Sequence, residues 1–172
     1  GHDAGACSHW HLAFNRWLLG WPDQAAGHMR DSLQLAEQLQ HAQTMGLAMS
    51  YAIWLHFQRG ERETAANFVE RLVALSEALG FRPYLDYALV MRALCSGIKV
   101  DAMALRNLTP KQAAGLVLSQ WRRAFCICTL AGCWLASGHV DEARAALASL
   151  AAADRGAFYA AEILRVEGEV AL

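Results

Sequence analysis

The stretch Trp17-Leu18-Leu19-Gly20-Trp21-Pro22-Asp23-Gln24-Ala25 decides the fold of this chain. In it, a glycine ends an apolar segment and an alanine follows five residues later. A tight turn favours glycine because it has no Cβ, and a close crossing of two helices favours the small side chain of alanine. The same pair recurs roughly every forty residues, as Gly60 with Ala65, Gly97 with Ala102 and Gly138 with Ala143. Four copies at one internal spacing predict a helical repeat.

Apolar residues at helical spacing predict a helix on each side of these turns. Pro22 suits the first turn of the second helix, where its missing N–H is not needed. The predicted helices span residues 6–19, 23–40, 47–57, 63–79, 84–95, 125–135, 141–151 and 157–172. With 55% apolar residues and only 3 prolines among 172 residues, the chain is expected to be one all-α domain, 1–172. Antiparallel helical hairpins stacked into an α-α superhelix would bury the apolar face that one hairpin leaves exposed.

One segment interrupts the repeat. Thr109-Pro110-Lys111-Gln112 has the pattern of a capping box, in which Thr caps a helix and Gln lies three residues further on. A new helix is therefore expected to begin at this point. Periodicity leaves open whether residues 110–136 form one helix kinked near 119–123 or two helices.

Charge and cysteine content argue against several classes of protein. The net charge of -1 provides no basic surface, so direct nucleic-acid binding is not expected. The 5 cysteines lack the dense spacing of a secreted disulfide framework, which favours a cytoplasmic location. The most apolar run, residues 124–136, is shorter than the roughly 20 residues that a membrane span needs.

Reactive constellations are not evident either. The lysines, Lys99 and Lys111, do not follow a glycine as the phosphate-binding lysine of a P-loop does. The pairs Cys126/Cys128 and His9/His11 point about 200° apart on a helix, so neither pair can hold one metal ion. Cys7 and His11 would share a helix face, but two ligands are too few. We expect no catalytic residue, no cofactor and no metal, and hence no enzyme activity in this chain.

Residues 17–25, followed by Leu35-Ala36-Glu37-Gln38-Leu39, resemble a tetratricopeptide-type repeat. More narrowly, they resemble the helical region on the C-terminal side of large bacterial signalling ATPases. Two further stretches are similar to the segments that open and close that region: Gly1-His2-Asp3 with Gly5 and Cys7, and Phe158-Tyr159 with Ala161-Glu162, Arg165, Gly168-Glu169 and Leu172. Residues 103–121 depart from the family pattern, and the spacing of about forty exceeds the tetratricopeptide period of 34.

The resemblance implies a right-handed tetratricopeptide-like superhelix that is a fragment of a larger multidomain protein, and the chain indeed begins without methionine. In that family the region follows an ATPase module. It often accompanies a class III adenylate or guanylate cyclase domain, or a LuxR-type or winged-helix DNA-binding domain. Any ATPase or cyclase activity would then lie outside this chain.

By the same resemblance, the first helix of each hairpin would line a concave groove. The residues expected on its wall are Trp10, Phe14, Trp17, Trp54, Phe57, Tyr84, Tyr87, Met91, Phe125 and Cys128. Of these, Trp10, Trp54 and Tyr87 are expected to be exposed. Aromatic side chains offer large contact areas for a peptide, a helix or an apolar small molecule. The alternative is that they pack between stacked helices.

These observations favour a non-catalytic scaffold or sensor module that binds a protein, a peptide or a small-molecule signal and regulates an attached ATPase, nucleotide cyclase or transcription regulator. A second hypothesis is self-association into a homo-oligomer through exposed ends of the array. A third is a small helical metal-binding protein or enzyme, based on the histidines and cysteines.

Overall fold

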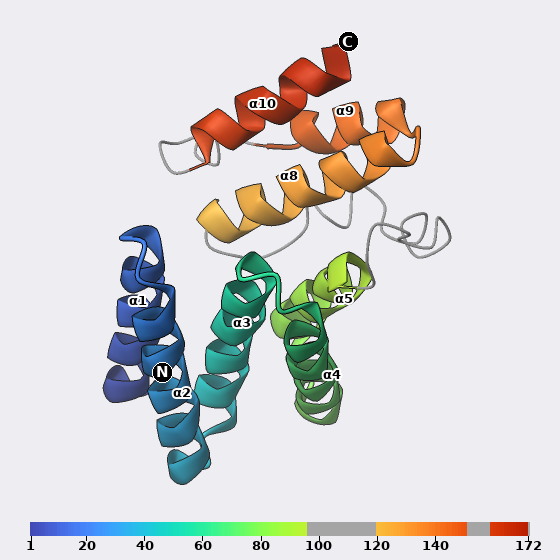
Figure 1. Ribbon diagram of the computed structural model, residues 1–172. Helices are drawn as coiled ribbons and strands as arrows, with labels where there is room; N and C mark the ends of the chain where they lie inside the picture. Colours follow the sequence, from blue (N-terminus) through green and yellow to red (C-terminus); the bar gives the residue numbers. More distant parts are fainter. Residues whose placement is uncertain (96–119, 151–158, 172) are drawn as a thin grey trace. The chain divides into compact units, whose positions relative to one another are not determined.

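The computed structural model describes residues 1–95, 120–150 and 159–171 (Figure 1). Within these ranges every regular element is an α-helix, which confirms the all-α prediction there. The helices are α1 Ala4–Leu18, α2 Pro22–Leu39, α3 Ala42–Gln58, α4 Arg62–Leu79, α5 Arg82–Cys95, α8 Gln120–Ala136, α9 Val140–Ala148 and α10 Ala160–Ala171. None of the described helices is long and apolar enough to cross a bilayer. The chain divides into two compact units, Gly1–Cys95 and Ser96–Leu172.

The turn glycines adopt the backbone conformation that their positions require. Gly20, Gly60 and Gly138 have φ angles of 80°, 77° and 79°, in the left-handed region that disfavours a Cβ. Each of these glycines donates its N–H to the carbonyl three residues earlier, and the next residue donates to the carbonyl five residues earlier, at 2.8–3.1 Å. This pair of bonds is the Schellman motif, which satisfies the last carbonyls of a helix. The same C-terminal cap therefore ends α1, α3 and α8.

The alanines of the repeat complete the first turn of the following helix. The N–H groups of Ala25, Ala65 and Ala143 donate to the carbonyls of Trp21, Glu61 and His139, at 3.0, 3.0 and 3.2 Å. All three alanines are fully buried. The predicted glycine and alanine pair is confirmed at these three places. The Gly97 and Ala102 pair and the capping box at 109–112 lie outside the described residues. Of residues 110–136, which were expected to form one helix kinked near 119–123 or two helices, only 120–136 are described, and they form the single helix α8.

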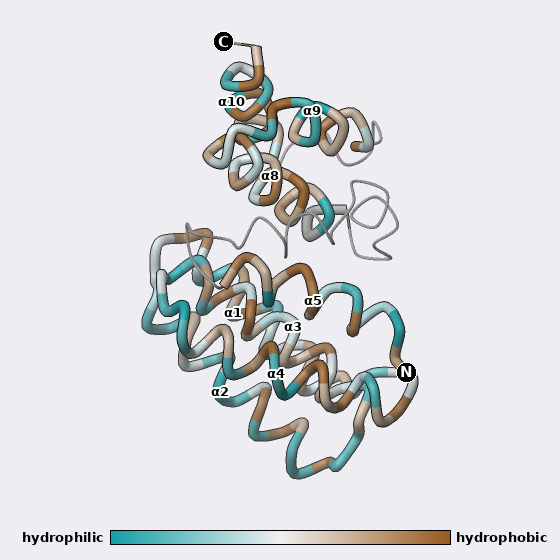
Figure 2. Tube along the Cα trace, turned by 90° about the vertical axis from the view of Figure 1, so that its right-hand side faces the viewer, coloured by the Kyte–Doolittle hydropathy of each residue, from teal (hydrophilic) through white to brown (hydrophobic). Residues whose placement is uncertain are grey.

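The buried positions of α2 and α4 show the repeat most directly. They are residues 25, 29, 32 and 36 in α2, and residues 65, 69, 72 and 76 in α4, together with Val73. Both sets follow the spacing of one helix face. Apolar and hydrophilic stretches accordingly alternate along the tubes of α2 and α4 (Figure 2). The two helices therefore bury equivalent faces of equivalent hairpins.

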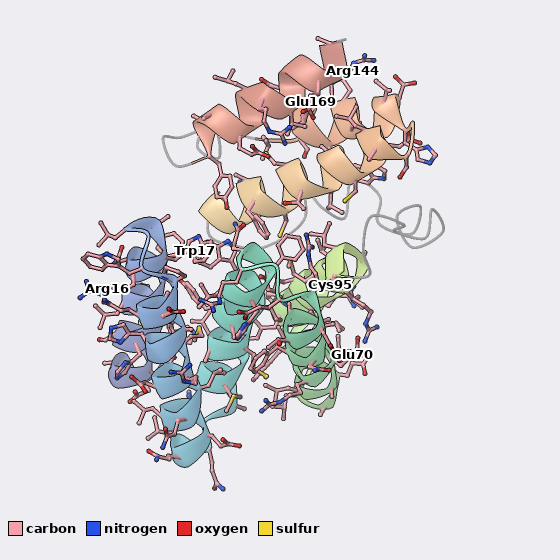
Figure 3. All side chains as sticks on the ribbon, viewed as in Figure 1. Arg16, Trp17, Glu70, Cys95, Arg144 and Glu169 are labelled. Atoms are coloured by element: carbon pink, nitrogen blue, oxygen red, sulfur yellow. The ribbon has the colours of Figure 1, made fainter. Side chains whose placement is uncertain are left out.

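The first unit is built around α3. This helix packs against α1, α2, α4 and α5, so it is buried on most of its circumference. Gly46 of α3 allows the close approach of α5, because a Cβ at this position would lie 3.0 Å from the ring of Tyr84. On the outside, the Arg92 guanidinium of α5 makes hydrogen bonds of 2.7 and 2.6 Å to both carboxylate oxygens of Glu70 in α4, a residue labelled in Figure 3.

Polar side chains also join the helices of this unit. The buried Ser32 hydroxyl of α2 donates to the Ala6 carbonyl of α1 at 3.0 Å. The Tyr87 hydroxyl of α5 donates to the Ser50 carbonyl of α3 at 3.1 Å. Both bonds lie in buried surroundings, where a lost partner is costly. They hold the register of neighbouring helices.

In the second unit, α8 and α9 form a hairpin across Gly138, and α10 packs against both. The apolar run of residues 124–136 lies in α8, where Cys126, Ile127, Leu130 and Trp134 are buried. Ile163 and Val166 of α10 complete the core. The helix predicted at 157–172 is described from Ala160 onward. The helix predicted at 141–151 ends at Ala148.

Two described helices begin five residues earlier than predicted: α8 begins at Gln120 and not at Phe125, and α3 begins at Ala42 and not at Leu47. The His41 side chain accepts a hydrogen bond from the Thr44 backbone N–H and so caps the helix. Histidine is not among the residues that usually mark a helix start, which explains why the pattern of apolar residues placed this start too late.

Candidate functional site

Burial separates the ten residues expected on the groove wall into two groups. Phe14, Trp17 and Tyr84 are partly exposed. The others are buried, namely Trp10, Trp54, Phe57, Tyr87, Met91, Phe125 and Cys128. The expected exposure of Trp10, Trp54 and Tyr87 is wrong, because their side chains are only 1%, 2% and 0% exposed. A ligand surface cannot be built on these three residues as they stand.

Ring contacts between α1 and α3 account for this burial. Trp10 stacks on Tyr51 with ring centroids 5.4 Å apart and planes at 14°. Phe14 contacts Trp54 at 5.0 Å. Such pairs add stability beyond the area that they bury. Most of the aromatic residues thus join the first helix of one hairpin to the first helix of the next, which is the packing alternative stated above.

Trp17, which is labelled in Figure 3, lies in the last turn of α1, next to the turn between α1 and α2. A hollow of about 680 Å³ is lined there by Trp17, Leu18, Gly20, Pro22, Asp23, Gln58 and Arg59. Its lining residues come from the end of α1, the start of α2 and the end of α3. Leu19 and Trp21, which neighbour lining residues in the sequence, are 62% and 44% exposed. The hollow therefore combines an apolar rim with polar groups, the usual composition of a binding site.

Arg59 connects the turns of two successive hairpins beside this hollow. Its Nη1 donates to the Pro22 carbonyl at 2.7 Å, and its Nε donates to Glu61 Oε1 at 2.7 Å. On the other side of that carboxylate, His56 Nδ1 lies 2.5 Å from Glu61 Oε2. Hydrogen bonds from His56 and then from Arg59 lower the pKa of the Glu61 carboxyl below its ordinary value. We call His56, Arg59 and Glu61 the turn clamp.

A second hollow, of about 460 Å³, lies in the second unit between α9 and α10. It is lined by Arg144, Leu147, Ala148, Glu167, Val170 and Ala171. Nearby on α10, Arg165 forms hydrogen bonds with Glu162 and Glu169 along the helix surface. Exposed pairs of this kind contribute less than about 1 kcal/mol each to stability. Such pairs are typical of a solvent-exposed helix face and do not indicate a binding site.

The cysteines are placed as small core residues. Cys95, Cys126 and Cys128 are buried, and burial raises the pKa of the Cys95 thiol to about 11. A thiol with a raised pKa is a poor nucleophile, because the thiolate is the reactive form. Cys7 is partly buried and His11 is exposed.

Among the described residues, His9, His28 and Asp31 form a group of possible metal ligands that was not predicted from the sequence. His28 and Asp31 are three residues apart and could have been paired from the sequence, since this spacing places two side chains on one helix face. The position of His9 opposite them follows from the packing of α1 on α2. No signal in the sequence gives this register directly.

Comparison with protein families, curated proteins and solved structures finds no match to this chain. The candidate sites are therefore defined by their own geometry.

Proposed function

We propose that this chain is a non-catalytic, tetratricopeptide-like helical-repeat module that binds a protein or peptide partner. The observation that carries the proposal is the equivalence of the hairpins, which share the glycine cap, the buried alanine and the matching buried faces of α2 and α4. Stacked hairpins of this kind form a right-handed superhelix whose repeated surface serves recognition. The resemblance of residues 17–25 to tetratricopeptide repeats supports the same assignment.

The hollow beside Trp17 is the proposed peptide-binding place. Leu18, Leu19 and Trp21 offer exposed apolar contacts, and aromatic side chains are common energetic centres of such interfaces. Gln58 supplies an amide that pairs with a peptide backbone, whereas the Arg59 charge is paired with Glu61 and lies 3.7 Å from Asp23. An extended segment with an apolar residue next to a polar one fits these groups.

The proposed role of binding is regulation of an attached ATPase, nucleotide cyclase or transcription regulator. This part of the proposal rests on the resemblance to the helical region of bacterial signalling ATPases. A partner changes the output of an attached domain only if it binds one arrangement of the protein more tightly than another. The exposed leucines of the first unit also favour a second candidate, in which the partner is another copy of this chain.

Selection from a random peptide display library tests the binding function. Enriched peptides should bind the wild-type chain, and Leu18→Ala, which truncates an exposed leucine of the hollow, should weaken binding roughly tenfold or more, since buried interface anchors contribute above about 1.4 kcal/mol. Leu79→Ala is the matched control, because Leu79 is also an exposed leucine near a helix end but lies outside the hollow. Fluorescence anisotropy of a labelled peptide gives the affinities.

Two outcomes contradict the proposal: no enriched peptide, or enriched peptides whose affinity is the same for all variants. Sedimentation equilibrium of the same samples distinguishes the candidates. A mass that rises with concentration, and falls in the Leu18→Ala variant, favours self-association at this surface over capture of a different partner.

A further inference from the structure

The hairpin of α1 and α2 brings together two imidazoles and a carboxylate on its solvent side. His9 lies in the middle of α1, and His28 and Asp31 lie one turn apart on α2. The hydrogen bond from Ser32 to the Ala6 carbonyl fixes the crossing of the two helices next to these residues. The backbone positions of the three side chains are therefore held by a packed core and not by a loop.

The three side chains are within reach of one ion. One ligand atom from each lies within 4.8 Å of the others, and His9 Nδ1 is 3.7 Å from Asp31 Oδ2. The rings of His9 and His28 have centroids 5.8 Å apart. Ligands of a tetrahedral zinc ion lie about 3.3 Å from one another, given bonds of about 2.0–2.1 Å. Small rotations of side chains, without a change in the helices, bring the three atoms to that spacing.

The imidazoles also have unused bonding capacity. The Nδ1 atoms of His9 and His28 are shielded from solvent and make no hydrogen bond within the described residues. A buried polar nitrogen without a partner costs free energy, so natural structures rarely leave one. The His9 nitrogen lies beside the Asp31 carboxylate, but their separation of 3.7 Å is too long for a hydrogen bond. A cation bound among them would engage both lone pairs and the carboxylate charge.

The ligand types select the class of metal. Imidazole nitrogens suit zinc and its neighbours among the first-row transition metals, whereas calcium and magnesium prefer all-oxygen sites. Three protein ligands leave a fourth tetrahedral position for water or for a group from a bound partner. Asp31 is exposed and the His9 side chain is partly exposed, so the ion has a path from solvent.

We propose that His9, His28 and Asp31 form a zinc site that joins α1 to α2. The site differs from the pairs considered in the sequence, because His9 acts with residues of the next helix and not with His11. Bound zinc cross-links the first hairpin and stabilises the folded chain by an amount that grows with the logarithm of the ratio of free zinc to its dissociation constant.

Cobalt(II) is the spectroscopic probe, because it takes zinc sites and its visible absorption is intense in tetrahedral and weak in octahedral coordination. The chelator-treated chain is titrated with cobalt chloride and then with zinc chloride, and zinc binding is measured by calorimetry. The expected result is one equivalent of bound metal, an intense visible band that zinc abolishes, and a higher melting temperature with zinc than without.

His28→Ala and Asp31→Asn should each weaken zinc binding by at least roughly 10- to 100-fold. Loss of an outer residue that only supports a metal ligand already costs this much. The matched control is His11→Ala, which removes an exposed histidine of the same helix and should leave binding unchanged. Asp31→Asn keeps the size of the side chain, so a loss of binding is not attributable to unfolding, and circular dichroism without metal checks this for every variant.

The proposal is overturned if the wild-type chain binds no cobalt or zinc, if the cobalt band is weak and octahedral, or if His11→Ala loses as much affinity as His28→Ala. Equal zinc affinity of the wild-type, His28→Ala and Asp31→Asn chains also overturns it, because the ion is then bound elsewhere.

Discussion

The turn glycines show how one backbone position constrains a residue type. Gly60 has a φ of 77°, and a Cβ at this position would meet no atom within 4 Å. There is room for a Cβ at this position, so steric crowding does not require glycine. The left-handed backbone conformation does require it. Gly27 is different, because it lies inside α2 without a positive φ and a Cβ there would come only as close as 3.9 Å to the flexible end of Arg30.

Substitution of these two glycines by alanine should change the free energy of unfolding in opposite directions. Gly60→Ala is expected to lower the free energy of unfolding by about 1–2 kcal/mol, the cost of a left-handed conformation with a Cβ. Gly27→Ala is expected to raise it by about 0.5–1 kcal/mol, because alanine reduces the entropy of the unfolded chain. Urea unfolding followed by circular dichroism measures both. Destabilisation by both substitutions would show that Gly27 is required by packing and not merely tolerated.

The turn clamp joins one hairpin to the next. Arg59 at the end of α3 donates to the Pro22 carbonyl at the start of α2, and Glu61 holds Arg59 and His56 at the α3–α4 turn. The clamp is charged and only partly buried, so its free energy depends on the ionisation of Glu61 and is reduced by solvent screening. It links elements whose apolar faces also pack together.

Acidification should weaken this clamp. Because the pKa of Glu61 is lower in the folded than in the unfolded chain, its contribution is present above the ordinary carboxyl pKa of about 4.3 and is lost as pH falls through the folded value. Glu61→Gln should destabilise the chain by less than about 1 kcal/mol at pH 7 and reduce the loss of stability between neutral and acid pH. Urea unfolding over a series of pH values measures this.

Glu63→Gln is the comparison, since it removes an exposed carboxylate of the same helix that lies outside the clamp. If Glu63→Gln reduces the loss of stability between neutral and acid pH as much as Glu61→Gln does, the effect comes from general surface charge. The turn clamp then has no particular role in the pH dependence of stability.

In the molecule as a whole, the helices form two compact units, and the first contains complete hairpins. The unit Gly1–Cys95 holds α1 to α5, with α3 surrounded by the other four helices. Its core includes large buried side chains from all of these helices, among them Trp10, Met29, Trp54, Leu72 and Tyr87. In a repeat array each element depends mainly on its neighbours in sequence, so a piece with complete neighbours retains most of its stability.

We therefore expect the fragment of residues 1–95 to fold without the rest of the chain. It should show helical circular dichroism and one cooperative thermal transition, as small single domains do. A fragment of residues 1–60, which lacks the α4 and α5 partners of α3, is the control and should lose the cooperative transition. A disordered 1–95 fragment would show that the first unit depends on the second, as expected for a single domain spanning residues 1–172.

The local structure was largely predictable, because it depends on short-range chemistry. Gly20, Gly60 and Gly138 marked the turns, and the apolar spacing marked the helices, to within a few residues in most cases. The start of α3 was missed because its cap is His41. The candidate sites were less predictable, since Trp10 and Tyr87 look the same in the sequence whether they face a groove or a neighbouring helix.

Periodicity and turn chemistry are properties of neighbouring residues, so the printed sequence was sufficient to assign most of the described helices and the turns at Gly20, Gly60 and Gly138. Exposure and side-chain grouping depend on which helix faces which, and this comes from packing over long distances along the chain. The burial of Trp10 against Tyr51 and the meeting of His9 with His28 and Asp31 are both of this second kind. They arise because the register of α1 against α2 and α3 is set by the complete core, in which every side chain competes for the same space.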